Sequence, residues 1–340
     1  MALLNLGDLT LEELTEYVRS TGESAFRGKQ IFEWIARGAE SLDDCTNLSK
    51  TLREKLSLAA EIYLPKVHRK LISKLDGTVK FLFELKDGNL VESVVMSYHH
   101  GYSICVSSQV GCRMGCTFCA STLNGLVRDL APYEISGQII AAQKDMGIEI
   151  SNVVVMGIGE PFDNYDNIIT FLKNINNQAG LGIGWRHITL STCGLADKIR
   201  RFAEEGMPIN LALSLHAPED ELRREMMPVA KAFTIEDTLT ACDTYFEKTG
   251  RRVTFEYALS EKNSSHDCAQ KLVKLLKGRN CHVNLIPVNP VRERDYIRSD
   301  KKTVSAFMDY LNKNGVNATL RRELGADISA SCGQLRNSEI

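Results

Sequence analysis

The sequence of 340 residues has no long hydrophobic run: no stretch approaches the ~18 consecutive apolar residues that a membrane-spanning helix needs. The N-terminal residues Met1–Asn5 include no basic residue, and the chain turns acidic by Asp8, which is unlike a secretory signal. Prolines are few, eight in all, and 44% of the residues are hydrophobic, which excludes collagen-like and disordered classes. These absences predict a cytoplasmic protein without a membrane partner.

The chain also lacks an excess of charge of either sign. It has 41 Lys and Arg residues against 43 Asp and Glu residues, so a net charge of −2 creates no global field that would attract nucleic acid. A polyanionic partner would have to meet local basic patches. The clearest patch is Lys66–Lys80, with five basic residues and one acid. A solvated strand face explains this patch as well as an RNA contact does.

Ten cysteines in a chain of this length are too few for a disulfide scaffold. Their uneven clustering instead indicates a metal site or catalysis in a reducing compartment. The length predicts one large domain with an appendage, or two domains.

Hydrophobic periodicity divides the chain into four regions. Residues 1–62 have helical spacing, residues 63–100 alternate like antiparallel strands with turns at Asp76-Gly77 and Asp87-Gly88, and residues 321–340 form a polar tail. Between them, residues 101–320 alternate six strands with helices, which indicates βαβ units and a parallel sheet. The predicted strands are Ser103–Ser107, Asn152–Met156, His187–Ser191, Ile209–Ser214, Val253–Tyr257 and His282–Ile286, and the predicted helices are 132–146, 164–178, 195–205, 234–249, 266–278 and 300–314.

Polar residues follow four of these six strands. Side chains at the carboxyl ends of many strands converge on one face of a (β/α) barrel, whereas a doubly wound sheet gathers them at one switch point. The pattern therefore favours an α/β fold with a partial barrel of six units. The segments that follow the strands are Gly157–Pro161, Ser191-Thr192, Ser214–His216 and Val288–Pro290.

Three cysteines, Cys112, Cys116 and Cys119, follow the first barrel strand with the spacing C-x₃-C-x₂-C. Thiolates at this spacing on one tight loop can hold three corners of an iron–sulfur cube, and Gly111 and Gly115 permit the backbone to wrap it closely. A zinc site usually needs four protein ligands, and no fourth cysteine or histidine lies adjacent in sequence. A distant fourth ligand, or cysteines that are merely buried, stay open as alternatives.

This cysteine spacing at the mouth of a six-unit barrel resembles the radical S-adenosylmethionine (SAM) superfamily. Over essentially the whole chain, the sequence resembles the RlmN/Cfr family of RNA adenine methyltransferases. Proline at position 161, directly after Glu160, resembles the RlmN branch, which methylates C2 of adenine. The C8-methylating Cfr branch typically has alanine at this position. The segments that carry the resemblance are Phe26–Gln30, Val91–Met96, Gly157–Pro161, Ser214–Ala217, Met226–Pro228, Phe255–Tyr257, His282–Pro290 and Cys332–Leu335.

The resemblance implies a radical SAM barrel with the tail over the active site and a 4Fe–4S cluster on Cys112, Cys116 and Cys119. It implies that two SAM molecules are used per turnover: Cys332 takes a methyl group from one, and the other yields a 5′-deoxyadenosyl radical that removes hydrogen from methylated Cys332. The methylene radical then adds to C2. Cys105 takes the C2 proton and attacks the sulfur of Cys332, which releases the product and leaves a disulfide. Glu92 is an alternative proton acceptor.

The SAM pocket follows from the resemblance residue by residue, and each of its members comes after a barrel strand. The remaining cysteines are explained by packing, although Cys193 lies close to the pocket residue Ser191. The predicted SAM-binding residues are Gly159, Glu160, Ser191, Ser214, Leu215, His216 and Asn289, and the cysteines without an assigned role are Cys45, Cys193, Cys242, Cys268 and Cys281.

The implied substrates are an adenosine in the peptidyl-transferase centre of 23S rRNA and the adenosine 3′ to the anticodon in some tRNAs, with a flavodoxin or ferredoxin as electron donor. A base that is stacked in RNA must be extruded to reach a buried cluster. The stretch Ser260–His266 lacks the Gly and Asp that the family commonly has there, which leaves the geometry of that loop open. The rival hypotheses are a C8-methylating resistance enzyme and a non-catalytic RNA-binding module with a structural metal.

Overall fold

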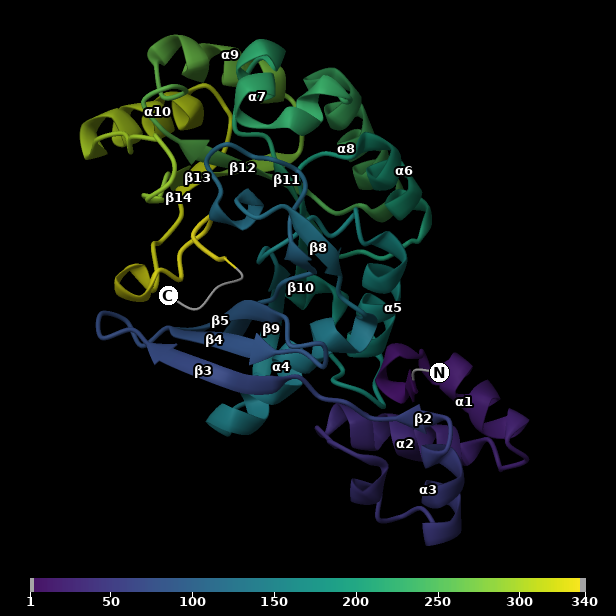
Figure 1. Cartoon of the computed structure of the whole chain (residues 1–340). Coiled ribbons are helices and arrows are strands. Elements are labelled where there is room, and N and C mark those ends of the chain that lie inside the picture. Colours follow the sequence, from purple (N-terminus) through teal and green to yellow (C-terminus); the bar gives the residue numbers. More distant parts are fainter. Residues whose placement is uncertain (1–2, 337–340) are drawn as a thin grey trace.

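A ten-stranded sheet forms the centre of the structure, a computed structural model that describes residues 3–336 (Figure 1). Residues 1, 2 and 337–340, which end the predicted N-terminal region and tail, lie outside the described residues. The strands lie in the spatial order β14-β13-β12-β11-β10-β9-β6-β5-β4-β3. Their bounds are β3 (Lys66–Ile72), β4 (Val79–Glu84), β5 (Leu90–Tyr98), β6 (Gly101–Cys105), β9 (Ile150–Val155), β10 (Ile188–Thr192), β11 (Asn210–Ser214), β12 (Val253–Leu259), β13 (Cys281–Pro287) and β14 (Ala318–Leu320).

The parallel part of this sheet is the partial barrel that the sequence predicts. Strands β6 and β9 to β14 are parallel, and β14 forms an edge, so the barrel stays open. All six predicted strands are present, but the first lies at Gly101–Cys105 rather than Ser103–Ser107, and His187 belongs to a 3₁₀ turn rather than to β10. The seventh strand, β14, is missing from the prediction because its three residues carry no recognisable apolar pattern.

Seven helices follow the strands and lie along the outside of the arc, while the tail lies on its inner side (Figure 1). Their apolar faces form the core: Phe202 and Tyr245, for example, stack with ring centroids 5.7 Å apart. The helices are α4 (Pro132–Met146), α5 (Tyr165–Asn176), α6 (Ala196–Glu204), α7 (Asp220–Met226), α8 (Ile235–Thr249), α9 (His266–Leu276) and α10 (Lys301–Lys313). The short helix α7 was not predicted. Within residues 3–336, no helix is long and apolar enough to cross a bilayer.

The antiparallel segment extends the same sheet, because β5 pairs with β6 of the barrel. Both predicted turns exist, and their glycines, Gly77 and Gly88, have positive φ angles of 74° and 81°. The predicted basic patch is only partly correct. Lys66 and Arg69 are exposed on β3, but Lys80 is buried against an acid of the neighbouring strand β5 and does not belong to the surface.

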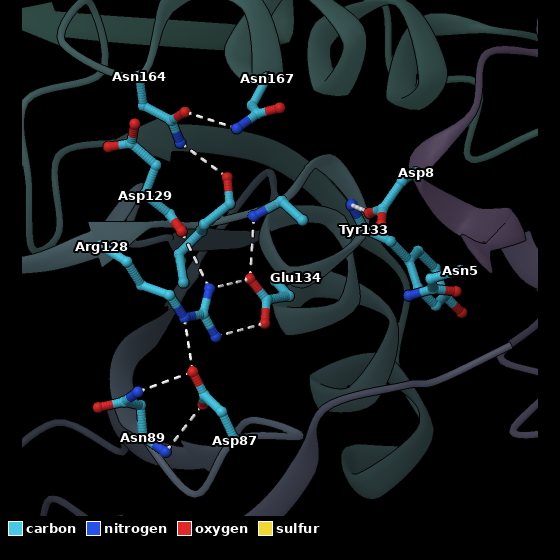
Figure 2. A network of polar contacts seen from close by, with 12 residues as sticks. Asn5, Asp8, Asp87, Asn89, Arg128, Asp129, Tyr133, Glu134, Asn164 and Asn167 are labelled. Carbon is cyan, nitrogen blue, oxygen red and sulfur yellow. Dashed lines mark hydrogen bonds and ion pairs between the residues drawn. The ribbon is translucent and has the colours of Figure 1, made fainter. Parts of the chain in front are cut away.

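The N-terminal region is helical as predicted, with α1 (Leu11–Ser20), α2 (Phe26–Ala36) and α3 (Lys50–Ser57). Two short parallel strands, β1 (Leu4–Asn5) and β2 (Ala60–Glu61), close it. Asp8 accepts a hydrogen bond of 3.0 Å from the backbone N–H of Tyr133 in the first turn of α4, which ties the region to the barrel (Figure 2).

A hairpin that the sequence did not predict, β7 (Gln109–Gly111) and β8 (Leu126–Asp129), carries the loop with the three clustered cysteines. Arg128 of β8 donates two hydrogen bonds to Glu134 at the start of α4, at 2.7 and 2.8 Å, and one of 2.6 Å to Asp87 in the β4–β5 turn (Figure 2). Bidentate pairs of this kind fix geometry as well as charge. The base of the cysteine loop is therefore anchored to the barrel and to the antiparallel strands.

Candidate active site

A cavity of about 170 Å³ lies at the carboxyl ends of the parallel strands. It brings together the three clustered cysteines, most of the predicted SAM-binding residues and the tail cysteine. Leu215, Cys105 and Glu92 do not line it; Leu215 is fully buried beneath its neighbours. The predicted site residues that line the cavity are Cys112, Cys116, Cys119, Gly159, Glu160, Ser191, Ser214, His216, Asn289 and Cys332.

The cysteine loop turns tightly at Gly111, which has a φ of 79°. A Cβ atom at this position would lie 1.9 Å from the carbonyl oxygen of Gly125, so only glycine fits. The backbone N–H of Cys112 donates to that same carbonyl at 2.9 Å, and the N–H of Cys119 donates to the carbonyl of Cys116 at 3.2 Å. The turn at Gly111 therefore requires glycine, and the close wrap of the loop around a cluster stays a prediction.

Cys112 is buried and Cys116 and Cys119 are half-buried. Burial raises the pKa of Cys112 to about 12 and also raises the pKa of Cys119. Such thiols lose their protons and act as ligands only when a bound cation stabilises the thiolate form in place of water. Within residues 3–336, no three His, Cys, Asp or Glu side chains converge on one metal ion, as a zinc site requires. The thiolates of a 4Fe–4S cluster each bind a different iron and need no such convergence.

A buried arginine behind the loop also fits a negatively charged group in the cavity. The guanidinium of Arg223 in α7 is fully buried and donates to the backbone carbonyls of Cys193 at 2.7 Å and Leu215 at 3.2 Å. Its Nη1 atom has no hydrogen-bond partner among the described residues. A buried cation is costly unless an anion lies nearby, and a 4Fe–4S cluster bound by three thiolates carries net negative charge. Sequence reasoning missed Arg223 because α7 was not predicted.

Gly159 and Glu160 form the turn that faces the cysteine loop. A Cβ atom on Gly159 would lie 2.7 Å from Ser108 Oγ, so the close approach requires glycine. The buried carboxylate of Glu160 accepts backbone hydrogen bonds from Phe162 at 3.1 Å and Cys193 at 2.7 Å. Burial raises the pKa of Glu160, and these bonds oppose the rise. Each carboxylate oxygen has a second acceptor site, so Glu160 can still accept from an ammonium group.

His216 lies on the other side of the cavity with a φ of 58°, a conformation that non-glycine residues adopt rarely. Its Nδ1 accepts a hydrogen bond of 2.9 Å from the N–H of Ala258, and burial lowers the pKa of His216 to about 3. The imidazole is therefore neutral. The ring of Phe118, a cavity residue that sequence reasoning missed, meets it edge-on at 4.9 Å between centroids.

The tail enters the same cavity at Cys332. The side-chain amide of Asn289 donates to the carbonyl of Cys332 at 3.0 Å, and the N–H of Ala120 in the cysteine loop donates to the carbonyl of Gly333 at 2.8 Å. Hydrogen bonds to the carbonyls of Cys332 and Gly333 thus hold the tail cysteine next to the cysteine loop.

Cys105 lies beneath the tail rather than in the open cavity. Its side chain packs with Leu324, Ala330 and Leu335 of the tail, and burial raises the pKa of Cys105 to about 12. All ten cysteines are free thiols, so the disulfide predicted between Cys105 and Cys332 is not formed in this structure.

Arg321, directly after β14, is a further cavity residue that sequence reasoning missed. Its Nη1 lies 3.7 Å from the buried carboxylate of Glu256, which also lines the cavity. Glu256 falls within the motif Phe255–Tyr257, but only recognition of β14 would have placed a cation opposite it.

Comparisons with known proteins agree with this geometry. Residues 4–62 match the ribosomal RNA large subunit methyltransferase N-terminal domain, and residues 106–286 match the radical SAM superfamily. The chain is 53% identical to a probable dual-specificity RNA methyltransferase RlmN of Lachnospira eligens, over 98% of this chain and 96% of that protein. A protein of the same name from Alkaliphilus oremlandii is also 53% identical, over 100% of this chain and 99% of that one. The chain belongs to the RlmN family.

A solved structure supports the RlmN family assignment at the level of the whole fold. The crystal structure of a radical SAM methyltransferase from Sphaerobacter thermophilus superposes with a TM-score of 0.93 at 41% identity, covering 98% of this chain and 100% of that one. Membership in the radical SAM superfamily implies a 4Fe–4S cluster and SAM as cofactors.

Proposed function

We propose that this chain is a radical SAM methyltransferase that methylates C2 of an adenosine in the peptidyl-transferase centre of 23S rRNA and of the adenosine 3′ to the anticodon in tRNA. One observation carries the proposal: the three-cysteine loop, the Gly159-Glu160 turn and Cys332 line one cavity. The first two would hold the cofactors, and the third supplies a nucleophile that can carry a methyl group.

The cofactors would be held by residues whose placement suits them. Cys112, Cys116 and Cys119 would bind three irons of the cluster and leave the fourth for the amino and carboxylate groups of SAM. When bound, the reduced cluster supplies the electron that cleaves SAM to a 5′-deoxyadenosyl radical. Around it, Glu160 would accept from the SAM amino group, and the other contacts would come from Gly159, Ser191, Ser214, His216 and Asn289. Leu215, which does not line the cavity, would support its neighbours from beneath.

C2 of adenine is electron-poor and is not a nucleophile, which explains the need for a methyl carrier. Cys332 as thiolate would displace the methyl group from one SAM. A second SAM would then provide the radical that takes a hydrogen atom from the methyl carbon on Cys332, so that the resulting methylene carbon can bond to C2. Two SAM molecules are consumed in each turnover.

Release of the product would fall to Cys105. Cys105, as thiolate, would take the C2 proton, and the unpaired electron of the adduct would pass to the oxidised cluster. Cys105 would then attack the sulfur of Cys332 and break its bond to the methylene carbon, which takes up the proton and becomes the methyl group, while a transient disulfide remains. The packing of Cys105 beneath the tail supports this role, because the tail with which Cys105 is in contact also carries Cys332. Glu92 is the alternative acceptor for the proton, although both of its carboxylate oxygens have partners in this structure.

The implied partners are 23S rRNA, tRNA and a flavodoxin or ferredoxin that reduces the cluster, in the cytoplasm. The preference for C2 over C8 rests on Pro161 and on the RlmN name of the relatives.

Mass spectrometry of adenosines tests this function. The chain is expressed in a strain that lacks its own C2 methyltransferase, and 23S rRNA and tRNA are digested and compared with RNA from the empty strain. The proposal predicts new 2-methyladenosine in both RNAs. New 8-methyladenosine would identify a Cfr-type activity instead, and no new methyladenosine from a cluster-loaded protein would support a non-catalytic RNA-binding module.

A further inference from the structure

A buried ion pair lies outside the cavity, between neighbouring strands of the antiparallel segment. Lys80 Nζ of β4 is 2.6 Å from Glu92 Oε1 of β5, and the two side chains are only 5% and 3% exposed. In the β4–β5 register, Glu92 faces Leu82, so Lys80 and Glu92 are diagonal neighbours on one face of the sheet.

The remaining hydrogen bonds of this pair go to the tail. Lys80 Nζ donates to the backbone carbonyl of Ser329 at 3.2 Å, and Glu92 Oε2 accepts from the backbone N–H of Arg336 at 2.6 Å. Cys332 lies between these two points. One ion pair therefore holds both ends of residues 329–336, which we call the Cys332 loop.

The Cys332 loop needs such support because its backbone is strained. Ser329 has a φ of 48°, a left-handed conformation that costs a non-glycine residue free energy unless its surroundings enforce it. Gly333 is also left-handed, with a φ of 80°. Fixed ends hold this backbone in place, together with the contacts of Asn289 and Ala120 to the carbonyls of Cys332 and Gly333.

Stability alone does not account for the pair. Desolvation of two buried charges offsets much of their attraction, and well-packed apolar residues of similar volume often serve the fold as well or better. What an apolar pair cannot do is hold a carbonyl at one end of a loop and an N–H at the other. The charges are therefore best explained by the backbone groups that they bind.

We propose that Lys80 and Glu92 are positioning residues that fix the Cys332 loop over the cavity, so that the Cys332 sulfur is presented to its methyl donor. This rests on the proposed function of Cys332 as methyl acceptor. Neither residue needs to touch SAM or RNA for this role. It also assigns Glu92 a task in the resting enzyme that is separate from proton transfer.

The test uses a double variant, Lys80→Met with Glu92→Leu, which removes both charges together and leaves neither one unpaired. The chain offers a matched control in Asp327, which lies just outside the Cys332 loop and binds the turn between β3 and β4: it accepts from Ser73 Oγ at 2.7 Å and from the N–H of Lys74 at 2.9 Å. Asp327→Ala removes two tail contacts without touching the ends of the loop.

Two quantities are measured on cluster-loaded enzyme without RNA: amide hydrogen exchange of residues 329–336, and the rate at which Cys332 gains a methyl group from SAM, by peptide mass spectrometry. The double variant should keep its thermal unfolding temperature, exchange the loop amides about tenfold faster and methylate Cys332 about tenfold more slowly, which corresponds to about 1.4 kcal/mol. Asp327→Ala should change the methylation rate less than about twofold.

Parental exchange and parental methylation in the double variant would overturn the proposal, as would an equal loss of methylation in Asp327→Ala. If even the parent never methylates Cys332, the proposed function of Cys332 fails. Exchange in the loop then still decides whether Lys80 and Glu92 hold it. If the double variant unfolds at a lower temperature than the parent, Glu92→Gln replaces it, because glutamine keeps the acceptor for the N–H of Arg336 but removes the charge. Slower methylation of Cys332 with faster exchange near Ser329 then supports the proposal. Parental values of both quantities overturn it.

Discussion

The side-chain amide of Asn289 donates a hydrogen bond of 3.0 Å to the backbone carbonyl of Cys332. Asn289 follows β13, and Cys332 lies in the tail, 43 positions later in the chain. The residue that is predicted to bind the methyl donor therefore also fixes the residue that is predicted to accept the methyl group. The predicted site of the methyl donor and the predicted methyl acceptor, Cys332, are thus connected by the side chain of Asn289.

The first prediction concerns this side chain. Asn289→Ala should slow methylation of Cys332 about fivefold or more, because a hydrogen bond of this kind contributes about 1 kcal/mol and a predicted SAM contact is lost with it. The measurement is the fraction of Cys332 peptide that carries a methyl group over time. Gln334→Ala is the comparison: it removes hydrogen bonds of 3.1 Å to the carbonyl of Pro290 and of 3.3 Å from the N–H of Ser331 but leaves the Cys332 carbonyl bound, so it should slow the rate less than Asn289→Ala does. Equal rates in the two variants would contradict the role of Asn289.

The second prediction concerns the turn of the cysteine loop. Gly111→Ala should prevent normal cluster incorporation, because its Cβ would collide with the carbonyl of Gly125 at 1.9 Å. Gly125→Ala is a matched control, since Gly125 has a similar φ of 68° but open space around its Cβ position. Iron content and visible absorption after anaerobic reconstitution should be low for Gly111→Ala and near parental for Gly125→Ala. Full iron loading of Gly111→Ala would show that the loop tolerates another path.

The third prediction concerns pH and the N-terminal region. Burial is the main cause that raises the pKa of Asp8 from 3.8 to about 6. The folded state therefore holds this proton more tightly than the unfolded state. The resulting stabilisation is present below pH ~4 and is lost as the pH rises through about 6, by an amount on the order of 2 kcal/mol.

Asp8→Asn should remove this loss, because an asparagine oxygen can still accept from the N–H of Tyr133 without burying a charge. The free energy of unfolding, measured in urea between pH 4.5 and 7, should fall with rising pH less steeply in the variant than in the parent. The variant should be the more stable protein at pH 7. Parallel curves for the two proteins would mean that Asp8 titrates as an exposed carboxyl group does.

Most of the barrel was predictable because its elements carry a strong local pattern. The six predicted strands and the long helices show clear periodicity. Strands β7, β8 and β14 have three or four residues each, and pairing with a neighbouring strand rather than a local pattern makes them strands. Helix α7 is short and rich in charged residues, so its sequence does not stand out from a loop. Arg128 helps to hold the β7–β8 hairpin in place, but its partner Asp87 lies 41 positions away in the chain.

The site was predictable where its residues fall in contiguous motifs, as Cys112, Cys116 and Cys119 do. It was not predictable where a role depends on a neighbour across the sheet. Lys80 was counted with a surface patch because it ends the stretch 66–80, which holds four other basic residues, yet Glu92 on the next strand pairs with it in the interior. Arg321 was missed for the same reason, since its partner Glu256 lies on another strand.

The central claim is that Cys332 carries the methyl carbon to RNA and that Cys105 releases it. It is tested most directly by turnover of Cys105→Ala with substrate RNA and SAM, followed by mass spectrometry of the protein, with the double variant Cys105→Ala and Cys332→Ala as control. The account predicts that Cys105→Ala accumulates a protein–RNA adduct joined through a methylene group on Cys332, and that the double variant forms none. Parental release of methylated RNA by Cys105→Ala, without any adduct, would contradict it.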